Sequence, residues 1–149
     1  MASVFQTEFI KVTESIKMKR YKIASRSIND NKLLKGIIAT KKPIIASLGM
    51  WKKKFFPFEN LSNVKYLFCV SKYPAPKSQI KFTKKFFKKY DGFSDHTLGL
   101  DKAKQSIKLG AQILEKHFTL DKKLSGPDHT LSILPNELKE LHKYRLKNG

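Results

Sequence analysis

Two histidines follow two successive strand-like segments that are separated by one helix-like segment. His96 stands in "GFSDHTL" (92–98) and His117 in "ILEKHFTL" (113–120), and the intervening "GLDKAKQSIKLGAQ" has a helical pattern. Neutral imidazole binds divalent transition metals, whose other positions are filled by carboxylate, water or substrate. Either the two rings face each other across one metal site, or each ring hydrogen-bonds a loop independently. Spacing alone leaves both interpretations open, because the pair lacks the i, i+4 spacing of two metal ligands on one helix.

Three carboxylates accompany these histidines in the sequence. Asp95, Glu115 and Asp128 offer oxygen ligands, or acceptors that would fix the imidazole tautomers. Glu115 lies two residues before His117 on a predicted strand, so the period of two places both side chains on the same face. Two polar side chains there occupy positions where a hydrophobic core would favour Leu or Val. The sequence therefore favours a site rather than a core on this face.

Serines at strand ends, together with one lysine, indicate a second kind of site. Ser25 and Ser47 end two predicted strands, and Lys22 lies within the first of them. Hydroxyl donors beside an ammonium can bind phosphate or carboxylate. Serines near turns also commonly make local hydrogen bonds, so that interpretation stays open. Lys22 is harder to explain structurally, because burying an unpaired ammonium among apolar residues is costly.

The elements that must position these residues alternate between strands and helices, as in βα units of a parallel sheet. Because Pro57 interrupts the segment 51–63, we expect no continuous helix there. This order fits a doubly wound sheet or part of a (β/α)8 barrel, and in both folds functional groups gather at the C-terminal ends of the strands. The predicted strands are 21–24, 43–47, 64–70, 92–95 and 111–118, and the predicted helices are 9–18, 29–40, 82–90, 101–109 and 135–147, the last capped near Asn136.

The net charge of +19 is the main compositional feature of the 149-residue chain. A basic chain can bind nucleic acid through its phosphates, and aromatic residues mixed with lysine in "WKKKFFPF" and "FTKKFFKKY" resemble surfaces that bind single strands. However, only three arginines are present, and the lysines form short clusters at 52–54, 84–85 and 88–89 rather than a long basic arm. A non-catalytic basic module that binds nucleic acid or anionic surfaces is therefore the alternative hypothesis, and nucleic acid is not the expected partner.

Targeting features point to the cytoplasm as the expected location. No apolar stretch reaches the roughly 20 residues of a membrane helix, and the N-terminus lacks the basic and apolar regions of a secretory signal. Cys69 is the only cysteine, which excludes an internal disulfide and fits a reducing compartment.

Six segments together resemble successive blocks of the sialic acid synthase family, which comprises N-acetylneuraminate synthase and its legionaminic and pseudaminic acid relatives. They occur in the family's order, from about 21 to 141. The blocks are "YKIAS", "KKPIIASLGM", "CVSKYPAP", "GFSDHTLGL", "ILEKHFTLDKKLSGPDHTLS" and "LPNELKEL".

The resemblance implies an enzyme on a (β/α)8 barrel that condenses phosphoenolpyruvate with an N-acetylmannosamine-type sugar. The products would be a nonulosonic acid and phosphate, and the cofactor a divalent metal, most commonly Mn²⁺. It implies His96 and His117 as metal ligands and Glu115 and Lys22 as catalytic residues. The implied substrate-binding residues are Ser25, Ser47, Ser71, Tyr73, Ser94 and Asp128.

The chain also departs from the family pattern. Ser25-Arg26-Ser27 stands where relatives commonly carry Ser-Gly-Glu, and Ser71 stands where some place Asn. The matched blocks correspond to strands four to eight of the barrel, with residues 1–20 as a leading helix segment. We therefore expect one partial barrel domain over 1–149, without the first three strands or the family's C-terminal antifreeze-like domain.

Such a piece would be inactive alone, or would need a separately encoded N-terminal half or a second copy of itself.

Overall fold

The computed structural model describes residues 1–83 and 85–149, which form two compact units, Met1–Leu67 and Phe68–Gly149. Lys84, part of the predicted helix 82–90 and of the lysine pair 84–85, lies outside the described residues. The strands are β1 (Ala2–Ser3), β2 (Tyr21–Ile23), β3 (Ile44–Ser47), β4 (Val64–Cys69), β5 (Gly92–Asp95) and β6 (Ile113–Lys116). The α-helices are α1 (Glu8–Ser15), α2 (Asn31–Ala39), α3 (Phe86–Lys89), α4 (Asp101–Lys108) and α5 (Pro135–Asn148), and two 3₁₀ turns cover Ser25–Ser27 and Lys77–Gln79.

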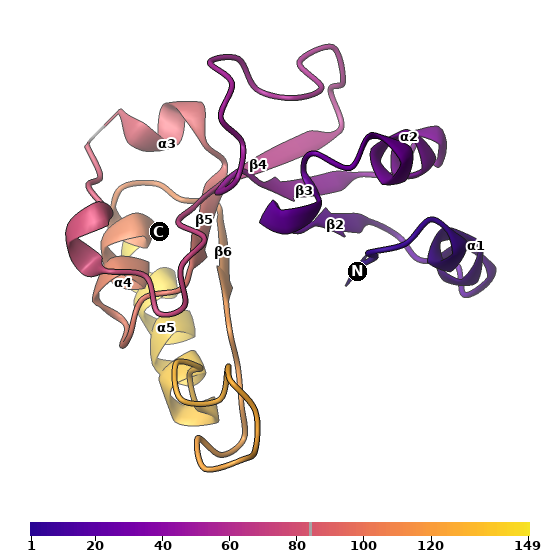
Figure 1. Ribbon diagram of the computed structural model, residues 1–149. Helices are drawn as coiled ribbons and strands as arrows, with labels where there is room; N and C mark the ends of the chain where they lie inside the picture. The colour runs from indigo at the N-terminus through magenta and orange to yellow at the C-terminus, as the bar shows by residue number, and fades with distance from the viewer. Residues whose placement is uncertain (84) are drawn as a thin grey trace. The chain divides into compact units, whose positions relative to one another are not determined.

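The first unit is built on parallel strands in chain order. β1 pairs with β2, β2 with β3, and β3 with β4, all in parallel. Helices α1 and α2 lie on one face of these strands (Figure 1). Asp30 caps α2 by accepting a hydrogen bond from the Leu33 N–H at 3.0 Å. Leu33, Leu34 and Ile37 form its buried face, so the predicted βαβ unit is confirmed.

The N-terminal segment contains a strand that we did not predict. We expected residues 1–20 to hold only a helix, but Ala2 and Ser3 pair with Tyr21 and Lys22. Two residues are too short to show a period-two pattern, so no sequence signal marks this strand. α1 is tied to β2 by Tyr21, whose hydroxyl donates to a Glu14 carboxylate oxygen at 2.6 Å.

The connection between β3 and β4 contains no helix. Residues 48–63 run through turns, as the position of Pro57 predicted. Phe58 within it has a φ of 62°, which is unusual for a bulky side chain. This connection lies beside the N-terminal end of α2 and forms part of the pocket discussed below.

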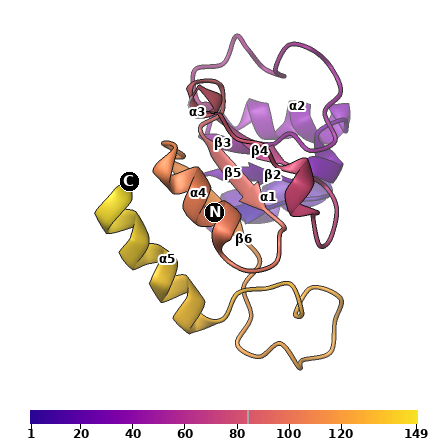
Figure 2. The ribbon, with the colours of Figure 1, turned by 90° about the vertical axis from the view of Figure 1, so that its left-hand side faces the viewer.

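The second unit packs helices against β5 and β6, which pair in parallel. Helices α4 and α5 lie side by side (Figure 2) around a buried cluster of Ala103, Ile107, Ile133 and Leu141. Gly110, with a φ of 98°, follows the end of α4, in the left-handed conformation that commonly ends a helix. The predicted cap near Asn136 was wrong: α5 begins at Pro135, and a carboxylate oxygen of Glu137 accepts the N–H of Leu134 instead.

The predicted helix over 82–90 was too long, because α3 covers only Phe86–Lys89. Like charges three and four positions apart destabilise a helix, and Lys85, Lys88 and Lys89 have that spacing. The aromatic residues of the segment instead gather around Phe68, whose ring contacts those of Phe82, Phe86, Tyr90 and Phe93.

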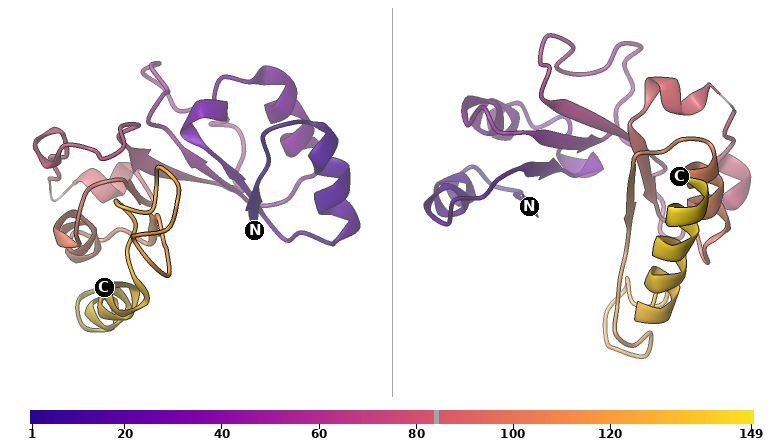
Figure 3. Two further views of the ribbon diagram at one scale, coloured as in Figure 1. Left: turned by 60° about the horizontal axis from the view of Figure 1, so that its bottom comes forward. Right: turned by 180° about the vertical axis from the view of Figure 1, so that it is seen from behind.

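A long loop connects β6 to α5 (Figures 2 and 3). It returns to the strand end through a parallel bridge between Phe118 and Ile133. The loop carries Asp128 and His129 back towards the end of β6. Within the described part of the chain, no helix combines the length and apolarity that crossing a membrane requires.

Candidate active site

The first unit brings Lys22, Ser25 and Ser47 together at the C-terminal ends of β2 and β3; we call them the anion cluster. Lys22 is buried, and its ammonium donates hydrogen bonds to Ser47 Oγ at 2.8 Å and to the Ile23 carbonyl at 3.1 Å. Ser25 Oγ accepts the N–H of Gly49 at 3.1 Å, which joins the loops after the two strands. A buried ammonium with hydroxyl groups beside it is suited to binding a phosphate or carboxylate.

The second unit brings His96 and His117 together at the ends of β5 and β6. Their ring centroids lie 5.3 Å apart with an interplanar angle of 69°. The adjacency follows from the register of the two strands, in which Ser94 pairs with Glu115 and Asp95 with Lys116. Each histidine is the residue directly after its strand, so the parallel pairing carries both to the same edge of the sheet.

His96 is held in one orientation by the end of β4. Its Nδ1 lies 3.0 Å from the Val70 carbonyl oxygen and 3.7 Å from Cys69 Sγ. Because a carbonyl oxygen only accepts, the proton belongs on Nδ1, which leaves Nε2 with a lone pair. A backbone carbonyl on the far nitrogen is the usual arrangement for a metal-binding histidine.

His117 faces Asp128 from the long loop. Its Nδ1 lies 3.6 Å from Asp128 Oδ2, close enough for the carboxylate to attract a proton on that nitrogen. The backbone carbonyl of His117 accepts the N–H of Ile133 at 2.8 Å, which fixes the strand end against the returning loop. Asp128 is therefore placed beside the imidazole.

The two histidines differ in basicity. Burial opposes protonation of His96, but hydrogen bonds to Cys69 and the Val70 carbonyl, together with the Glu115 charge, raise its pKa above the ordinary value. Burial and the neighbouring His96 lower the pKa of His117, and this outweighs the attraction of Asp128 and Glu115. The lowered pKa favours the neutral imidazole of His117, which is the form of histidine that can bind a metal.

Glu115 and Ser94 lie on the same face as the histidines. Ser94 is buried, and its hydroxyl donates to Glu115 Oε2 at 2.6 Å, which orients the carboxylate. Tyr73 covers the pair from the loop after β4: its ring centroid lies 4.3 Å from that of His96 and 5.6 Å from that of His117.

Three further polar residues near the strand ends contact partners other than the histidine rings. Ser71 contacts Cys69 Sγ at 3.8 Å. His129 lies one residue after Asp128, and its Nδ1 shares a hydrogen bond of 2.8 Å with Thr119 Oγ1. Asp95, considered as a metal ligand, points to the opposite face: Oδ2 pairs with Lys116 at 2.9 Å and Oδ1 accepts the N–H of Thr97 at 2.8 Å. Both oxygens of Asp95 are therefore directed away from the histidine rings.

The histidine pair fits a contribution of two ligands to one metal ion. Two imidazoles that share an ion through bonds of about 2.1 Å place their ring centroids roughly 5 Å apart, which agrees with the observed 5.3 Å. Among the described residues, no group of three or more His, Cys, Asp or Glu side chains is arranged to hold an ion. Any further ligands must be water, substrate or groups outside these residues.

Three parts of this site were not predicted from the sequence. Cys69 and the Val70 carbonyl orient His96, and Lys116 forms the buried ion pair behind the histidines. Backbone carbonyls leave no sequence signal. Lys116 did leave one, because it is a charged residue inside a strand, as Lys22 is, and the same argument about buried charge applies to both.

Known proteins resemble this chain over nearly its whole length. A family model described as the NeuB family matches residues 1–147. The N,N'-diacetyllegionaminic acid synthase of Campylobacter jejuni is 36% identical over 156 residues, covering 95% of this chain and 46% of that protein. The pseudaminic acid synthase of Helicobacter pylori is 33% identical over 153 residues, covering 94% of this chain and 45% of that protein.

A solved structure shows the same relationship. The N-acetylneuraminic acid synthetase of Leptospira borgpetersenii matches with a TM-score of 0.86 and 27% identity, over 97% of this chain and 55% of that one. This likeness confirms the predicted fold class, an α/β fold that corresponds to part of a (β/α)8 barrel. The chain spans less than half the length of the two synthases above.

Proposed function

The chain belongs to the NeuB family, and from this premise we propose that it takes part in the condensation of phosphoenolpyruvate with an N-acetylmannosamine-type sugar. A carbon–carbon bond forms between C3 of phosphoenolpyruvate and the aldehyde carbon of the open-chain sugar. Water is consumed, and a nonulosonic acid and inorganic phosphate are released. The observation that carries the proposal is the convergence of His96 and His117, 5.3 Å apart, beside the carboxylate of Glu115.

His96 and His117 would hold a divalent metal, most commonly Mn²⁺ in enzymes of this kind. When bound, the metal would supply Lewis-acid polarisation of the sugar's aldehyde. The chain's contribution is to fix the tautomer of the neutral His96 ring, because the hydrogen bond of Nδ1 to the Val70 carbonyl leaves the lone pair on Nε2. The Tyr73 ring packs against both imidazole rings.

Glu115 is the proposed acid–base residue near the reacting carbons. The hydrogen bond from Ser94 at 2.6 Å occupies one of its oxygens and fixes the direction of the carboxylate. A positioned carboxylate can hold or move a proton on the sugar's aldehyde oxygen as that oxygen becomes a hydroxyl. Tyr73, Asp128 and Ser71 are the proposed contacts to the sugar.

The anion cluster is proposed to bind phosphoenolpyruvate. Its phosphate and carboxylate carry the charge that the Lys22 ammonium would balance, and the Ser25 and Ser47 hydroxyls would donate to their oxygens. Lys22 is catalytic in the sense that it contacts the reacting substrate and stabilises charge on the departing phosphate.

Turnover requires more of the barrel than these residues provide. The match covers less than half of the relatives' length, so we propose that the remaining strands must be supplied, whether by the same polypeptide or by another chain. We expect no phosphate release when the 149-residue chain is incubated alone with phosphoenolpyruvate, N-acetylmannosamine and Mn²⁺. Unassisted turnover would contradict this part of the proposal.

Metal binding tests the proposal directly without requiring turnover. We expect the chain to bind Mn²⁺, measured by calorimetry, and the His96→Ala and His117→Ala variants each to lose that binding. His142→Ala is the matched control, because it also removes one imidazole, but from an exposed position on α5. Equal binding by all three variants would refute the assigned metal site.

The basic surface favours a second candidate function, the binding of nucleic acid. Lys53 lies over the Trp51 ring at 5.3 Å and Lys54 lies 6.0 Å from the Phe55 ring centroid, so cations and rings are paired on an exposed segment. Retention of a single-stranded oligonucleotide at physiological salt, unchanged by His96→Ala, would favour this function over the synthase.

A further inference from the structure

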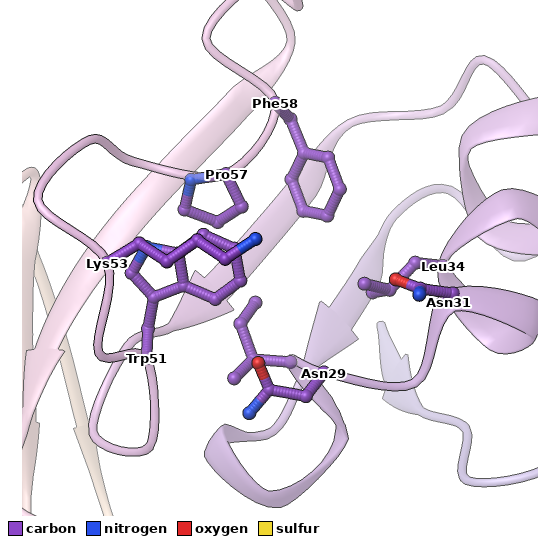
Figure 4. A pocket seen from close by; sticks show the side chains of 8 residues that line it. Asn29, Asn31, Leu34, Trp51, Lys53, Pro57 and Phe58 are labelled. Carbon is purple, nitrogen blue, oxygen red and sulfur yellow. The ribbon is translucent and has the colours of Figure 1, made fainter.

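A pocket in the first unit lies apart from the anion cluster, between the N-terminal end of α2 and the loop that follows β3. Its volume is about 290 Å³, close to the lower limit of roughly 300 Å³ for small-molecule pockets. Figure 4 shows Trp51 and Lys53 on one side, Leu34 and Asn31 on the other, and Phe58 and Pro57 above. The lining residues are Ile28, Asn29, Asn31, Leu34, Trp51, Lys53, Pro57 and Phe58.

The pocket exists because the chain has no helix between β3 and β4. The segment that replaces the helix is held in place by its own hydrogen bonds. Trp51 Nε1 donates to the Phe55 carbonyl at 2.8 Å, and the hydroxyl of Tyr66 on β4 donates to the Pro57 carbonyl. The Phe56 ring also packs on Tyr66, with centroids 4.8 Å apart. The wall formed by this segment is therefore a fixed part of the first unit.

The backbone at Phe58 supports the same conclusion. Its φ of 62° is strained for a bulky residue, and such strain persists where the surrounding structure enforces it, commonly at binding sites. Glycine would adopt this conformation without the strain. The conformation presents the Phe58 ring to the pocket, as Figure 4 shows.

The polar groups of the pocket define the ligand chemistry. Lys53 supplies one ammonium, which the Trp51 ring attracts at 5.3 Å. Asn29 and Asn31 supply carboxamides, which donate to and accept from hydroxyl groups. Among the described residues, no acidic side chain lines the pocket, and the net charge of +19 attracts anions to the whole chain.

We propose that this pocket binds a small anionic sugar, meaning a monosaccharide that carries a phosphate or a carboxylate group. The Lys53 ammonium pairs with the anionic group, and the carboxamides of Asn29 and Asn31 hydrogen-bond the hydroxyls. Phe58, Pro57 and Leu34 cover the apolar face of the ring. None of the lining residues belongs to the anion cluster, so the site is separate from the residues assigned to phosphoenolpyruvate.

The chain has a built-in reporter for this site. Trp51 is its only tryptophan, so a ligand that enters the pocket changes the only indole emission. Glucose 6-phosphate and glucuronate are the two charged probes, which separate phosphate from carboxylate recognition. Glucose and inorganic phosphate are the matched controls that lack the charge or the ring. We expect saturable quenching or enhancement with at least one charged sugar, and binding at least about tenfold weaker for both controls.

Variants of residues in and near the pocket test whether the ligand binds there. Lys53→Met removes the ammonium but keeps the apolar stem, and we expect it to weaken binding about tenfold or more. Lys52→Met and Lys54→Met change the net charge equally on residues that do not line the pocket, and we expect less than about a twofold effect at these exposed positions. Asn31→Ala is a second pocket variant and should also weaken binding.

Three results would overturn the proposal. The first is no saturable change with either charged sugar. The second is an equal loss in the Lys52, Lys53 and Lys54 variants, which would indicate diffuse charge attraction or a nucleic-acid surface. The third is loss of binding in Lys22→Met but not in Lys53→Met, which would place the sugar at the anion cluster. Because the metal-binding test uses other residues, failure of this site leaves the proposed synthase function unaffected.

Discussion

The ion pair between Asp95 and Lys116 provides the strongest test of how the histidines are positioned. Each residue immediately precedes one histidine, and the two charges meet on the opposite face of the same strand ends. Their side chains are 0% and 3% exposed. Lys116→Met keeps the length of the side chain and removes its charge. Among the described residues, the buried Asp95 carboxylate then keeps the Thr97 N–H as a hydrogen-bond donor.

The magnitude follows from the distance and the burial. At the observed 2.9 Å, two unit charges attract by roughly 6 kcal/mol at an effective dielectric constant of 20. Desolvation of both ions offsets much of that attraction, but the variant keeps the desolvation cost of Asp95 and loses its partner. Breaking such a pair by removing one side costs about 3–5 kcal/mol. At roughly 3 °C per kcal/mol, the unfolding midpoint of the variant should fall by about 10–15 °C.

The assay is thermal and urea unfolding followed by circular dichroism. Lys108→Met is the matched control, because Lys108 is exposed on α4. Its free energy of unfolding should differ from that of the parent chain by less than about 0.5 kcal/mol. In the double variant Asp95→Asn/Lys116→Met, the buried charge is gone but an acceptor for the Thr97 N–H remains. This variant should recover at least about 2 kcal/mol of the loss.

The same variants test the link to the metal site. If the ion pair aligns the strand ends, Lys116→Met should weaken Mn²⁺ binding by about tenfold at a temperature where it remains folded. A free energy of unfolding for Lys116→Met within about 1 kcal/mol of the parent chain would refute the burial argument. Unchanged Mn²⁺ affinity in a destabilised but folded Lys116→Met variant would refute the positioning role.

Three further predictions concern single positions. A hydrogen bond from Lys42 lowers the pKa of Glu14, so the ionised Glu14 stabilises the fold above the ordinary carboxyl pKa, and this stability is lost as pH falls through the lowered pKa. Glu14→Gln should therefore reduce the urea midpoint at pH 7 and make the midpoint fall less on acidification. Parallel pH profiles of the variant and the parent chain would contradict this prediction. Gly92→Ala would place a Cβ 1.9 Å from the Ile113 carbonyl oxygen, so we expect the free energy of unfolding to fall by about 3 kcal/mol or more. A fall of less than about 1 kcal/mol would contradict the close approach of β5 and β6. The Thr97 hydroxyl oxygen is buried without a hydrogen-bond partner among the described residues, so Thr97→Val should leave the chain equally stable or about 1 kcal/mol more stable, and clear destabilisation would reveal a partner for the hydroxyl.

The residues that the sequence predicted best are those placed by strand period and parallel pairing. Glu115 and His117 share a face because they are two positions apart, and His96 joins them because the two strands are parallel neighbours. Lys22 and Ser47 meet for the same reason, since each lies near the end of its strand. These contacts depend on regular geometry that a pattern of residues specifies.

The features that the sequence did not predict depend on irregular or very short segments. β1 has two residues and leaves no periodic signal. The segment 82–90 has enough helix-forming residues to predict a helix, but repulsion among its lysines and the packing of its rings around Phe68 limit α3 to four residues. Val70 orients His96 through its backbone carbonyl, which is independent of the side chain at that position.

Alternation along β5 and β6 explains why a site and a structural ion pair can occupy adjacent residues. Ser94 and Glu115 point to the face that bears the histidines, whereas Asp95 and Lys116 point to the opposite face. A carboxylate on the histidine face can serve the site, but a carboxylate one residue away cannot reach it, because successive side chains of a strand point to opposite sides. The proposed site residues and the structural ion pair are therefore separated by the alternation of side chains along the two strands. A one-residue slip between β5 and β6 would pair the wrong residues and separate the two imidazoles. The buried ion pair disfavours that slip, and for this reason we expect its removal to affect metal affinity as well as stability.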